Sequence, residues 1–313
     1  MGVTELIVLR WGRAEYERAA LTGLPDGVRV VDADGDDAPL EEADVLVVPS
    51  VRPVTAAVVE RLRQCRLVLT TTSGFDHVDV AAVRAAGIRC ERLPMARRDA
   101  VVETALGMIL SLNRRFGSIQ VGAASGRWER DRLPAYGARL LGTVGVVGVG
   151  VIGARMVDLL TVLGATVFRC DPVLADGESL DEVIARADVV TLHCELTETS
   201  RGMFDAGVIA RMRPGSILVN TARGKVVDAA AAVAAVRAGH LGGFGCDVFP
   251  CEPADLSGFV DPRVIVLPHA AGWHPGLDAR IADGVRDAVQ HILDGSDPAP
   301  TRFSPYSAPR GTP

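Results

Sequence analysis

The stretch Thr143-Val-Gly-Val-Val-Gly-Val-Gly-Val-Ile-Gly153 decides the fold of this chain. Its apolar part, Val144–Val149, predicts a β-strand, and Ala154–Leu163 continues with the spacing of a helix. Between them stands Gly148-x-Gly150-x-x-Gly153, whose glycines allow a tight turn and a close approach of the backbone to a pyrophosphate. The amino end of the following helix offers free N–H groups to an anion. Strand, turn and helix together predict a dinucleotide-binding βαβ unit.

The cofactor is indicated by the end of the next predicted strand, Thr166–Cys170, which is followed directly by Asp171. A carboxylate at this point accepts hydrogen bonds from the ribose hydroxyls of NAD(H) and repels the 2′-phosphate of NADP(H). We therefore predict NAD(H), with Val151 and Ile152 beside the glycines in the same site. Arg169 keeps NADP(H) open, and a glycine turn without any nucleotide is the other alternative.

The rest of the chain repeats the order of strand and helix on both sides of this motif. Repeated β-α-β order predicts parallel sheets covered by helices, so the fold class is α/β with two doubly wound domains. Strands are expected at 6–9, 28–31, 45–48, 67–70 and 88–90, and then at 166–170, 189–193 and 217–220. Shorter helices are expected at 55–63, 80–86, 180–187 and 229–238.

Two longer helices, Arg98–Phe116 and Gly276–Asp294, are expected to connect the domains. The polar segment 122–142 breaks the periodic pattern and is expected to form an arm that carries Trp128 and Tyr136. Residues 295–313 are rich in Pro, Ser and Gly and are expected to form an extended tail, in which Phe303 and Tyr306 dock locally.

Size and composition limit the class of protein. A chain of 313 residues with 48% hydrophobic and 23% charged residues fits two globular domains. The net charge is −6 and no basic block is present, which argues against nucleic acid as a partner. No apolar run reaches the roughly 18 residues of a membrane span, and the start lacks a signal peptide, so we expect a cytoplasmic protein. The six cysteines form no CxxC pair, which argues against a metal site.

Three polar residues stand after three apolar runs, at 215–220, 241–249 and 264–267. Arg223 can clamp a carboxylate and polarise a carbonyl, His269 can pass a proton near neutral pH, and Glu252 can keep that imidazole charged. Together they equip a site for the reduction of a 2-keto acid. The alternatives are an Arg–Glu pair that merely links two loops and a histidine with a structural role.

Several motifs in order resemble the D-isomer-specific 2-hydroxyacid dehydrogenase family. They are Ser73-Gly-Phe-Asp-His-Val-Asp79, Leu141 through Gly153, Leu192-His193, Asn220-Thr-Ala-Arg-Gly224, Asp247 through Pro253, and Pro268-His269. The resemblance implies a flavodoxin-like substrate domain, formed by 1–97 and 284–313, into which a Rossmann cofactor domain, 98–283, is inserted. It also implies an active site in the cleft between the two domains.

The resemblance implies a role for each matching residue. Arg223 binds the carboxylate and carbonyl oxygen of the substrate, His269 is the acid and base, and Glu252 is its partner. Ser73 and Gly74 offer backbone N–H groups to the substrate carboxylate. The residues implied to contact the cofactor, beyond the glycine turn, are Asp247 at the nicotinamide amide, Thr221, Ala222 and Cys194 at the nicotinamide ring, Thr104, and Gly272.

The sequence departs from the family pattern at Glu195, where a proline is usual. Arg52 stands in a loop where it could read a second anionic group of the substrate, such as phosphate or phosphonate, and the alternative is an exposed loop arginine. The side-chain specificity is expected to come from Val51, Arg52, Ser73, Trp273 and His274. His77 and His193 are expected to be structural.

We expect an NAD-dependent oxidoreductase that interconverts a 2-keto acid and a D-2-hydroxy acid. The resemblance implies a homodimer through the 122–142 arm, and the alternative is that Trp128 and Tyr136 form a small separate core. A phosphite- or phosphonate-oxidising dehydrogenase with the same three residues is an alternative. An NADH-sensing binding protein, similar to the corepressors that share this fold, is an alternative of another class.

Overall fold

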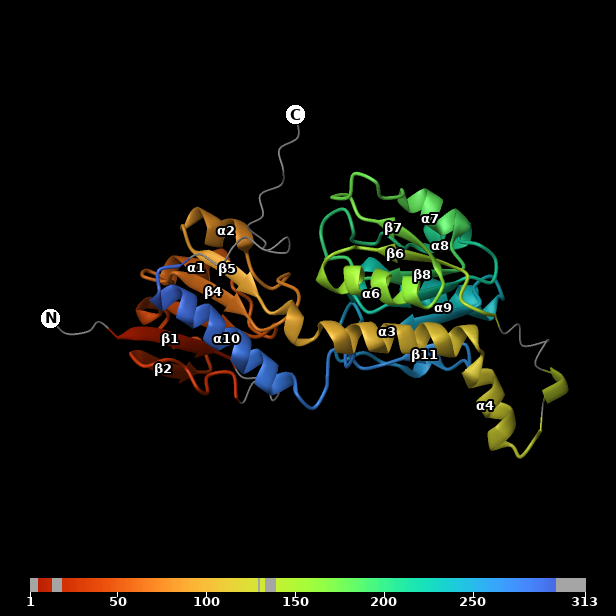
Figure 1. The fold of residues 1–313 in the computed structure, drawn as a ribbon, viewed down its shortest axis with the longest axis horizontal. Coiled ribbons are helices and arrows are strands. Elements are labelled where there is room, and N and C mark those ends of the chain that lie inside the picture. The colour runs from red at the N-terminus through yellow and green to blue at the C-terminus, as the bar shows by residue number, and fades with distance from the viewer. Residues whose placement is uncertain (1–4, 13–18, 129, 133–138, 297–313) are drawn as a thin grey trace. The chain divides into compact units, whose positions relative to one another are not determined.

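The chain forms two compact units in the computed structural model, which describes residues 5–12, 19–128, 130–132 and 139–296. The first unit comprises residues 1–97 and 274–313, and the second comprises residues 98–273. The expectations for Tyr136, Phe303 and Tyr306 lie outside the described residues. Figure 1 shows the elements of each unit in chain order.

The first unit is built on a five-stranded parallel sheet with the order β2-β1-β3-β4-β5. This is the strand order of flavodoxin-like folds and confirms the predicted fold class. The strands are β1 (Leu6–Trp11), β2 (Val28–Ala33), β3 (Val45–Val48), β4 (Leu67–Thr70) and β5 (Arg89–Arg92).

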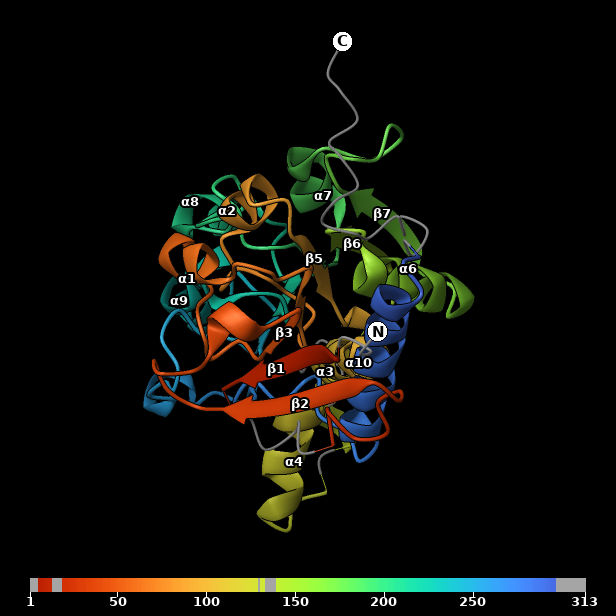
Figure 2. The same cartoon turned by 90° about the vertical axis from the view of Figure 1, so that its left-hand side faces the viewer.

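Both faces of this sheet are covered, because successive side chains of a strand point to opposite sides. Leu9 packs in the core that includes α1 (Ala56–Arg61) and α2 (Val80–Ala85), whereas its neighbour Val8 packs in the core that includes α10 (Leu277–Leu293). Figure 2 shows α1 and α2 on one side of the strands and α10 on the other. Strands buried on both faces explain the continuous apolar runs of the sequence.

The second boundary between the units corrects the sequence prediction. It falls after Trp273 and not after residue 283, because the whole of α10 belongs to the first unit. The apolar residues of α10 recur at helical spacing and are buried in one core with the strands of the first sheet. They are Leu277, Ile281, Val285, Ala288, Val289 and Ile292.

The second unit has a six-stranded parallel sheet with the order β11-β10-β9-β8-β6-β7. The chain passes from β6 to β7 on one side and then crosses to β8 on the other, so the strand order reverses at β6, where nucleotides bind in such sheets. The strands are β6 (Thr143–Val147), β7 (Thr166–Cys170), β8 (Val189–Leu192), β9 (Ile217–Asn220), β10 (Gly243–Cys246) and β11 (Val264–Val266).

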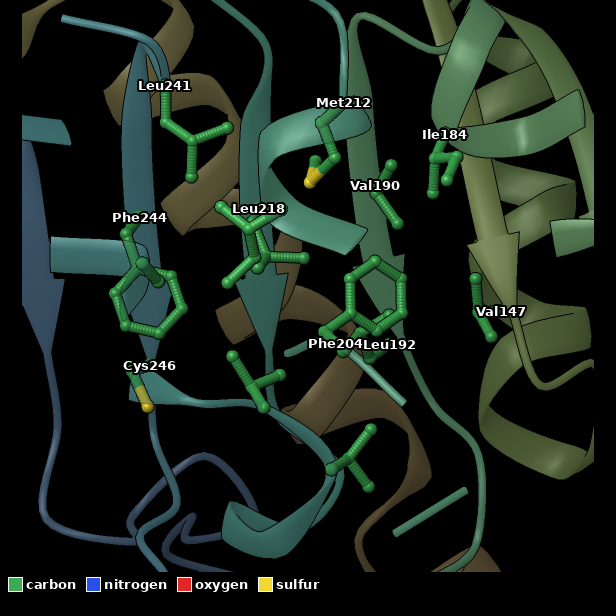
Figure 3. Close-up of a cluster of buried hydrophobic side chains, with 14 of the residues drawn as sticks. Val147, Ile184, Val190, Leu192, Phe204, Met212, Leu218, Leu241, Phe244 and Cys246 are labelled. Atoms are coloured by element: carbon green, nitrogen blue, oxygen red, sulfur yellow. The ribbon is translucent and has the colours of Figure 1, made fainter. Parts of the chain in front are cut away.

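Helices cover both faces of this sheet as well. One core holds side chains of α3 (Arg98–Asn113) and α6 (Val151–Val162), and the other holds side chains of α7 (Leu180–Arg186), α8 (Ala206–Arg211) and α9 (Ala229–Arg237). Figure 3 shows the second of these cores, in which Phe204 and Phe244 lie among aliphatic side chains of β8 and β9.

The first long helix is shorter than predicted. It ends at Asn113, Arg115 adopts a left-handed conformation with φ of 59°, and a separate helix α4 (Phe116–Ala124) follows. Gly117, the residue after the predicted helix Arg98–Phe116, therefore lies inside α4. Trp128, beyond α4, is 91% exposed. None of the helices within the described ranges has the length and apolar content needed to cross a membrane.

Candidate active site

The glycine turn between β6 and α6 is tightly packed at its first and third glycines and leaves space at its second. Gly148 has φ of 86°, and a Cβ there would lie 2.4 Å from the backbone nitrogen of Cys194. A Cβ on Gly153 would lie 1.9 Å from the carbonyl oxygen of Gly148. A Cβ on Gly150, at the amino end of α6, would meet no described residue within 4 Å. The first and third glycines are thus required by packing, and the second leaves space at a helix amino end, which fits a pyrophosphate.

Asp171 is held beside this turn. Its Oδ2 accepts a hydrogen bond from the Val149 N–H at 2.7 Å, and its Oδ1 accepts one from the Val173 N–H at 3.0 Å. Each carboxylate oxygen has further acceptor capacity for a ribose hydroxyl. Arg169 forms an ion pair with Asp176 at 2.8 Å, and the hydrogen bond that its guanidinium donates to that carboxylate raises the pKa of Arg169. Because Arg169 already has an acidic partner, the arrangement favours NAD(H) over NADP(H).

The three predicted catalytic residues follow three adjacent strands. Arg223 comes after β9, Glu252 after β10 and His269 after β11, and these strands are parallel neighbours in the sheet. The carboxyl ends of parallel strands meet at one edge of a sheet, which is also the edge that carries the glycine turn. The sheet therefore brings the loops of all three residues to the cofactor side of the second unit.

Glu252 and His269 are in direct contact. Oε2 of Glu252 lies 2.6 Å from Nδ1 of His269, and Oε1 accepts a hydrogen bond from the Phe249 N–H at 2.9 Å. The carboxylate is therefore anchored to the backbone while it orients the imidazole. The His269 side chain is 52% exposed, and Nδ1 is the atom in contact with the glutamate, so Nε2 is the nitrogen suited to exchange a proton with a substrate.

The backbone of His269 is strained, with φ of 55°. A left-handed conformation costs a residue other than glycine about 1–2 kcal/mol. The surrounding turn is held by Asp247, whose carboxylate accepts the N–H groups of Ala270 and Ala271 at 2.7 and 3.0 Å. Asp247 is 1% exposed, and this burial raises its pKa. Thr104, on α3, donates its hydroxyl to the Ala271 carbonyl at 3.2 Å.

Asp247 and Thr104 were predicted from the resemblance to contact the cofactor. Their visible contacts instead shape the turn that carries His269, and the cofactor contacts remain predictions. Gly272 follows the same turn and is half-buried, whereas Trp273 is exposed.

The turn after β9 sets the position of Arg223. Arg223 is half-buried, and its Nη1 donates a hydrogen bond to the Ala222 carbonyl at 2.8 Å. The side chain of Asn220 contacts the backbone on both sides of this turn. Asn220 was not among the predicted site residues, although a polar residue at the end of a buried apolar strand was a signal for it. Thr221 is buried, and its Oγ1 has no hydrogen-bond partner within the described part of the chain, which leaves a polar atom for a ligand.

The loop after β8 contributes apolar surface and no reactive group. Burial raises the pKa of the Cys194 thiol to about 11, so Cys194 is neutral near pH 7. Burial lowers the pKa of His193 to about 4, and its Nε2 lies 3.0 Å from the Thr191 hydroxyl, which indicates a neutral, structural imidazole. Glu195 is exposed, and its carbonyl accepts the Ser200 hydroxyl at 2.6 Å.

The predicted substrate-binding residues of the first unit lie on two of its loops. The Ser73–Gly74 turn follows β4, where the Thr72 hydroxyl donates to the Gly74 carbonyl at 2.7 Å and Arg92 donates to the Ser73 carbonyl at 3.0 Å. The turn is thus fixed by side chains around it.

Arg52 is engaged in the first unit. Its guanidinium lies 2.5 Å from Asp34 and packs 5.5 Å from the centre of the Trp11 ring. An anionic substrate group would have to compete with Asp34 for this arginine, which weakens the hypothesis that Arg52 reads such a group.

Known proteins resemble this chain over most of its length. The family model described as "D-isomer specific 2-hydroxyacid dehydrogenase, NAD binding domain" matches residues 106–271. D-3-phosphoglycerate dehydrogenase of Mycobacterium leprae is 32% identical over 89% of this chain and 55% of its own, so the chain spans about half the length of that relative. Hydroxypyruvate reductase of Thermotoga maritima is 33% identical over 68% of this chain and 72% of its own.

Among solved structures, the D-lactate dehydrogenase of Aquifex aeolicus, complexed with NAD and lactic acid, superposes with a TM-score of 0.73. It is 26% identical and is matched over 92% of this chain and 96% of its own. The two parallel-sheet α/β units agree with the fold of these relatives. The chain belongs to the D-isomer specific 2-hydroxyacid dehydrogenase family.

Proposed function

We propose that the chain is an NAD-dependent oxidoreductase that interconverts a 2-keto acid and a D-2-hydroxy acid. The observation that carries the proposal is the contact of 2.6 Å between Glu252 and His269, on the same sheet edge as Arg223 and the glycine turn. An oriented imidazole, a guanidinium and a dinucleotide site at one edge are the parts that reduction of a carbonyl beside a carboxylate needs.

The glycine turn and Asp171 would hold NADH, which would supply the hydride for C2 of the keto acid, so negative charge would develop on the carbonyl oxygen. Arg223 binds the substrate carboxylate and stabilises that developing charge. Protonated His269 gives the proton on Nε2 to the same oxygen. Glu252 stabilises the imidazolium through Nδ1 before the transfer and keeps the ring oriented after it. Oxidation of the hydroxy acid uses the same groups in reverse, with neutral His269 as the base.

The proposal includes a contribution of the first unit to substrate binding. Backbone N–H groups of Ser73 and Gly74 are proposed to hold the substrate carboxylate, and this is supported by the side-chain contacts that fix their turn. Val51, Trp273 and His274 are proposed to select the substrate side chain. Val51 and Trp273 are exposed apolar residues in the described part of the chain, as such a role requires.

We also propose a cytoplasmic homodimer that uses α4 and the arm after it. Phe116 and Val121 on α4 are each more than half exposed, and Trp128 is nearly fully exposed. Exposed aromatic and aliphatic side chains that gather on one segment are typical of protein interfaces. The molar mass in solution, measured by light scattering for the chain and for Trp128→Glu, tests this part of the proposal, which a monomeric parent chain would contradict.

The role of Arg223 is tested by Arg223→Lys and Arg223→Ala, with Arg237→Ala as the matched control. Arg237 is an arginine of the same unit that binds only a loop carbonyl, of Gly258, among the contacts seen. We expect both Arg223 variants to bind NADH and to lose turnover of a 2-keto acid. Arg223→Lys should retain more turnover than Arg223→Ala, because lysine keeps the positive charge although it lacks the planar guanidinium fork. Full turnover by Arg223→Ala would refute the assignment. NADH binding by the parent without turnover of any keto acid would favour the sensor alternative.

A further inference from the structure

The side chain of Asn220 spans the turn that carries Arg223. It is fully buried at the carboxyl end of β9. Its Oδ1 accepts a hydrogen bond from the Ala222 N–H at 3.0 Å, and its Nδ2 donates one to the Arg223 carbonyl at 3.0 Å. One amide group thus closes the loop from the strand end to the arginine, because it holds the Thr221–Ala222 peptide group by its N–H and the peptide group after Arg223 by its carbonyl.

This double contact requires a particular kind of side chain. It needs an acceptor and a donor on the same carbon, because one partner is an N–H group and the other is a carbonyl. An amide offers both at once, whereas a carboxylate offers acceptors only. Since the group is fully buried, water is not available to replace a missing partner.

The same strand end is connected to the His269 turn. The Asp247 N–H donates to the Asn220 carbonyl at 3.0 Å, and the His269 N–H donates to the Asp247 carbonyl at 2.7 Å. The backbone therefore joins the two turns, whereas both hydrogen bonds of the Asn220 side chain go to the Arg223 turn. A change of that side chain should act on Arg223 more than on His269.

We infer that Asn220 is a positioning residue that sets the carboxylate-binding geometry of Arg223. The inference rests on the proposed function, since it specifies how the substrate-binding arginine of that site is held. It predicts that the loss of the amide raises KM for the 2-keto acid far more than it lowers kcat.

The decisive variant is Asn220→Asp, which has nearly the same shape. As a carboxylate it still accepts from the Ala222 N–H but presents an acceptor to the Arg223 carbonyl. When protonated, it can donate to that carbonyl and restore the pattern of the amide. We therefore expect KM to rise by about tenfold or more above neutral pH, where one buried hydrogen bond is replaced by repulsion, and the ratio of variant to parent KM to fall as the pH is lowered.

The chain offers a matched control, because Asn113 is its other asparagine. Asn113 ends α3, is 2% exposed, and neither polar atom of its amide has a hydrogen-bond partner among the described residues. Asn113→Asp also buries a carboxylate in the second unit, so it reports the general cost of that change. It should lower Tm without changing KM. Asn220→Ser, which keeps a small hydroxyl, serves if Asn220→Asp does not fold.

The experiment measures kcat and KM for a 2-keto acid across pH, together with the binding of ADP-ribose and of oxamate. ADP-ribose lacks the nicotinamide and should bind every folded variant as it binds the parent. Oxamate, an unreactive analogue of a 2-keto acid, should bind the NADH complex of Asn220→Asp about tenfold more weakly or worse. The inference is overturned if Asn220→Asp keeps the KM and oxamate affinity of the parent, or if Asn113→Asp shifts them equally. A parent chain that neither turns over a keto acid nor binds oxamate would overturn the proposed function itself, and this inference with it.

Discussion

The glycine turn permits a prediction in which two alanine substitutions, three residues apart, have opposite effects. At Gly150 a Cβ meets nothing within 4 Å, and the backbone has φ of −76°, which alanine adopts readily. Alanine restricts the unfolded chain more than glycine does, which stabilises the folded state by about 0.4–1 kcal/mol. Alanine at a helix N-cap destabilises the folded state by a similar amount, so the two effects offset each other. We therefore expect the Tm of Gly150→Ala to stay within about 2 °C of the parent.

The cofactor should respond strongly to the same change. The added methyl group occupies the space at the amino end of α6 where the pyrophosphate is proposed to approach the backbone. Loss of one hydrogen bond to a charged phosphate costs about 1.5–3 kcal/mol, so the Kd for NADH should rise about 10- to 150-fold.

Gly153→Ala should instead lower the thermal stability of the second unit. Its Cβ would lie 1.9 Å from a backbone oxygen, and real Cβ contacts are not shorter than 3.0 Å, so the turn and α6 must separate by 1.1 Å. Such overpacking costs about 1–3 kcal/mol, which lowers Tm by about 2–12 °C in a unit of this size. Gly107→Ala, on α3, is the control, because its Cβ also meets nothing within 4 Å but lies outside the turn.

Thermal unfolding and a fluorescence titration with NADH are measured on all three variants. Unchanged NADH affinity in Gly150→Ala, at an unchanged Tm, would refute the assignment of this turn to the pyrophosphate.

The remaining predictions concern single side chains of the second unit. Asp171→Ala should weaken NADH binding while NADPH binding changes little, as measured by paired titrations, and a parent chain with equal affinity for both would contradict the ribose argument. His269→Asn should lower kcat about 10²- to 10⁴-fold, and asparagine is chosen because it tolerates the left-handed backbone. Glu252→Gln should lower kcat less, and both variants should still bind NADH. Full activity of either variant in steady-state assays would exclude the catalytic role of that residue. Burial lowers the pKa of His193 from 6.5 in the unfolded chain to about 4 in the folded chain. The unfolded chain therefore binds the proton first, and the folded state loses stability as the pH falls from about 6.5 to about 4. His193→Gln should reduce this pH-dependent loss of unfolding free energy by about 2–4 kcal/mol, as measured by urea unfolding at several pH values. An unchanged dependence on pH would contradict the lowered pKa of His193.

Much of this fold follows from the sequence because both sheets are parallel and buried. Strands such as Val45–Val48 read as continuous apolar runs, and the glycine turn has a fixed relation to the strand and helix around it. The break between α3 and α4 could not be read, since it depends on Arg115 in a left-handed conformation and not on a proline or glycine at that point. The boundary near α10 depends on which sheet the helix packs against, and periodicity alone does not specify the partner.

The common sheet edge of the three predicted catalytic residues could be predicted from the sequence, whereas the contacts around them could not. The order of Arg223, Glu252 and His269 after three apolar runs indicated their common sheet edge, and β9, β10 and β11 are indeed neighbours. The contacts of Asp247 and Asn220 with backbone groups of these loops depend on turn geometry that a motif does not show. The ion pair of Arg52 likewise could not be predicted from the sequence, because its partner Asp34 lies on a different loop.

The central claim is that Arg223, Glu252 and His269 support hydride transfer to a 2-keto acid, and one measurement tests it most directly. The parent chain is incubated with NADH and a panel of 2-keto acids, NADH consumption is followed by absorbance, and the configuration of each hydroxy acid formed is determined by chiral chromatography. The account predicts NADH consumption matched by formation of the D-2-hydroxy acid from at least one keto acid. NADH binding without consumption across the panel, or formation of the L-hydroxy acid, would contradict it.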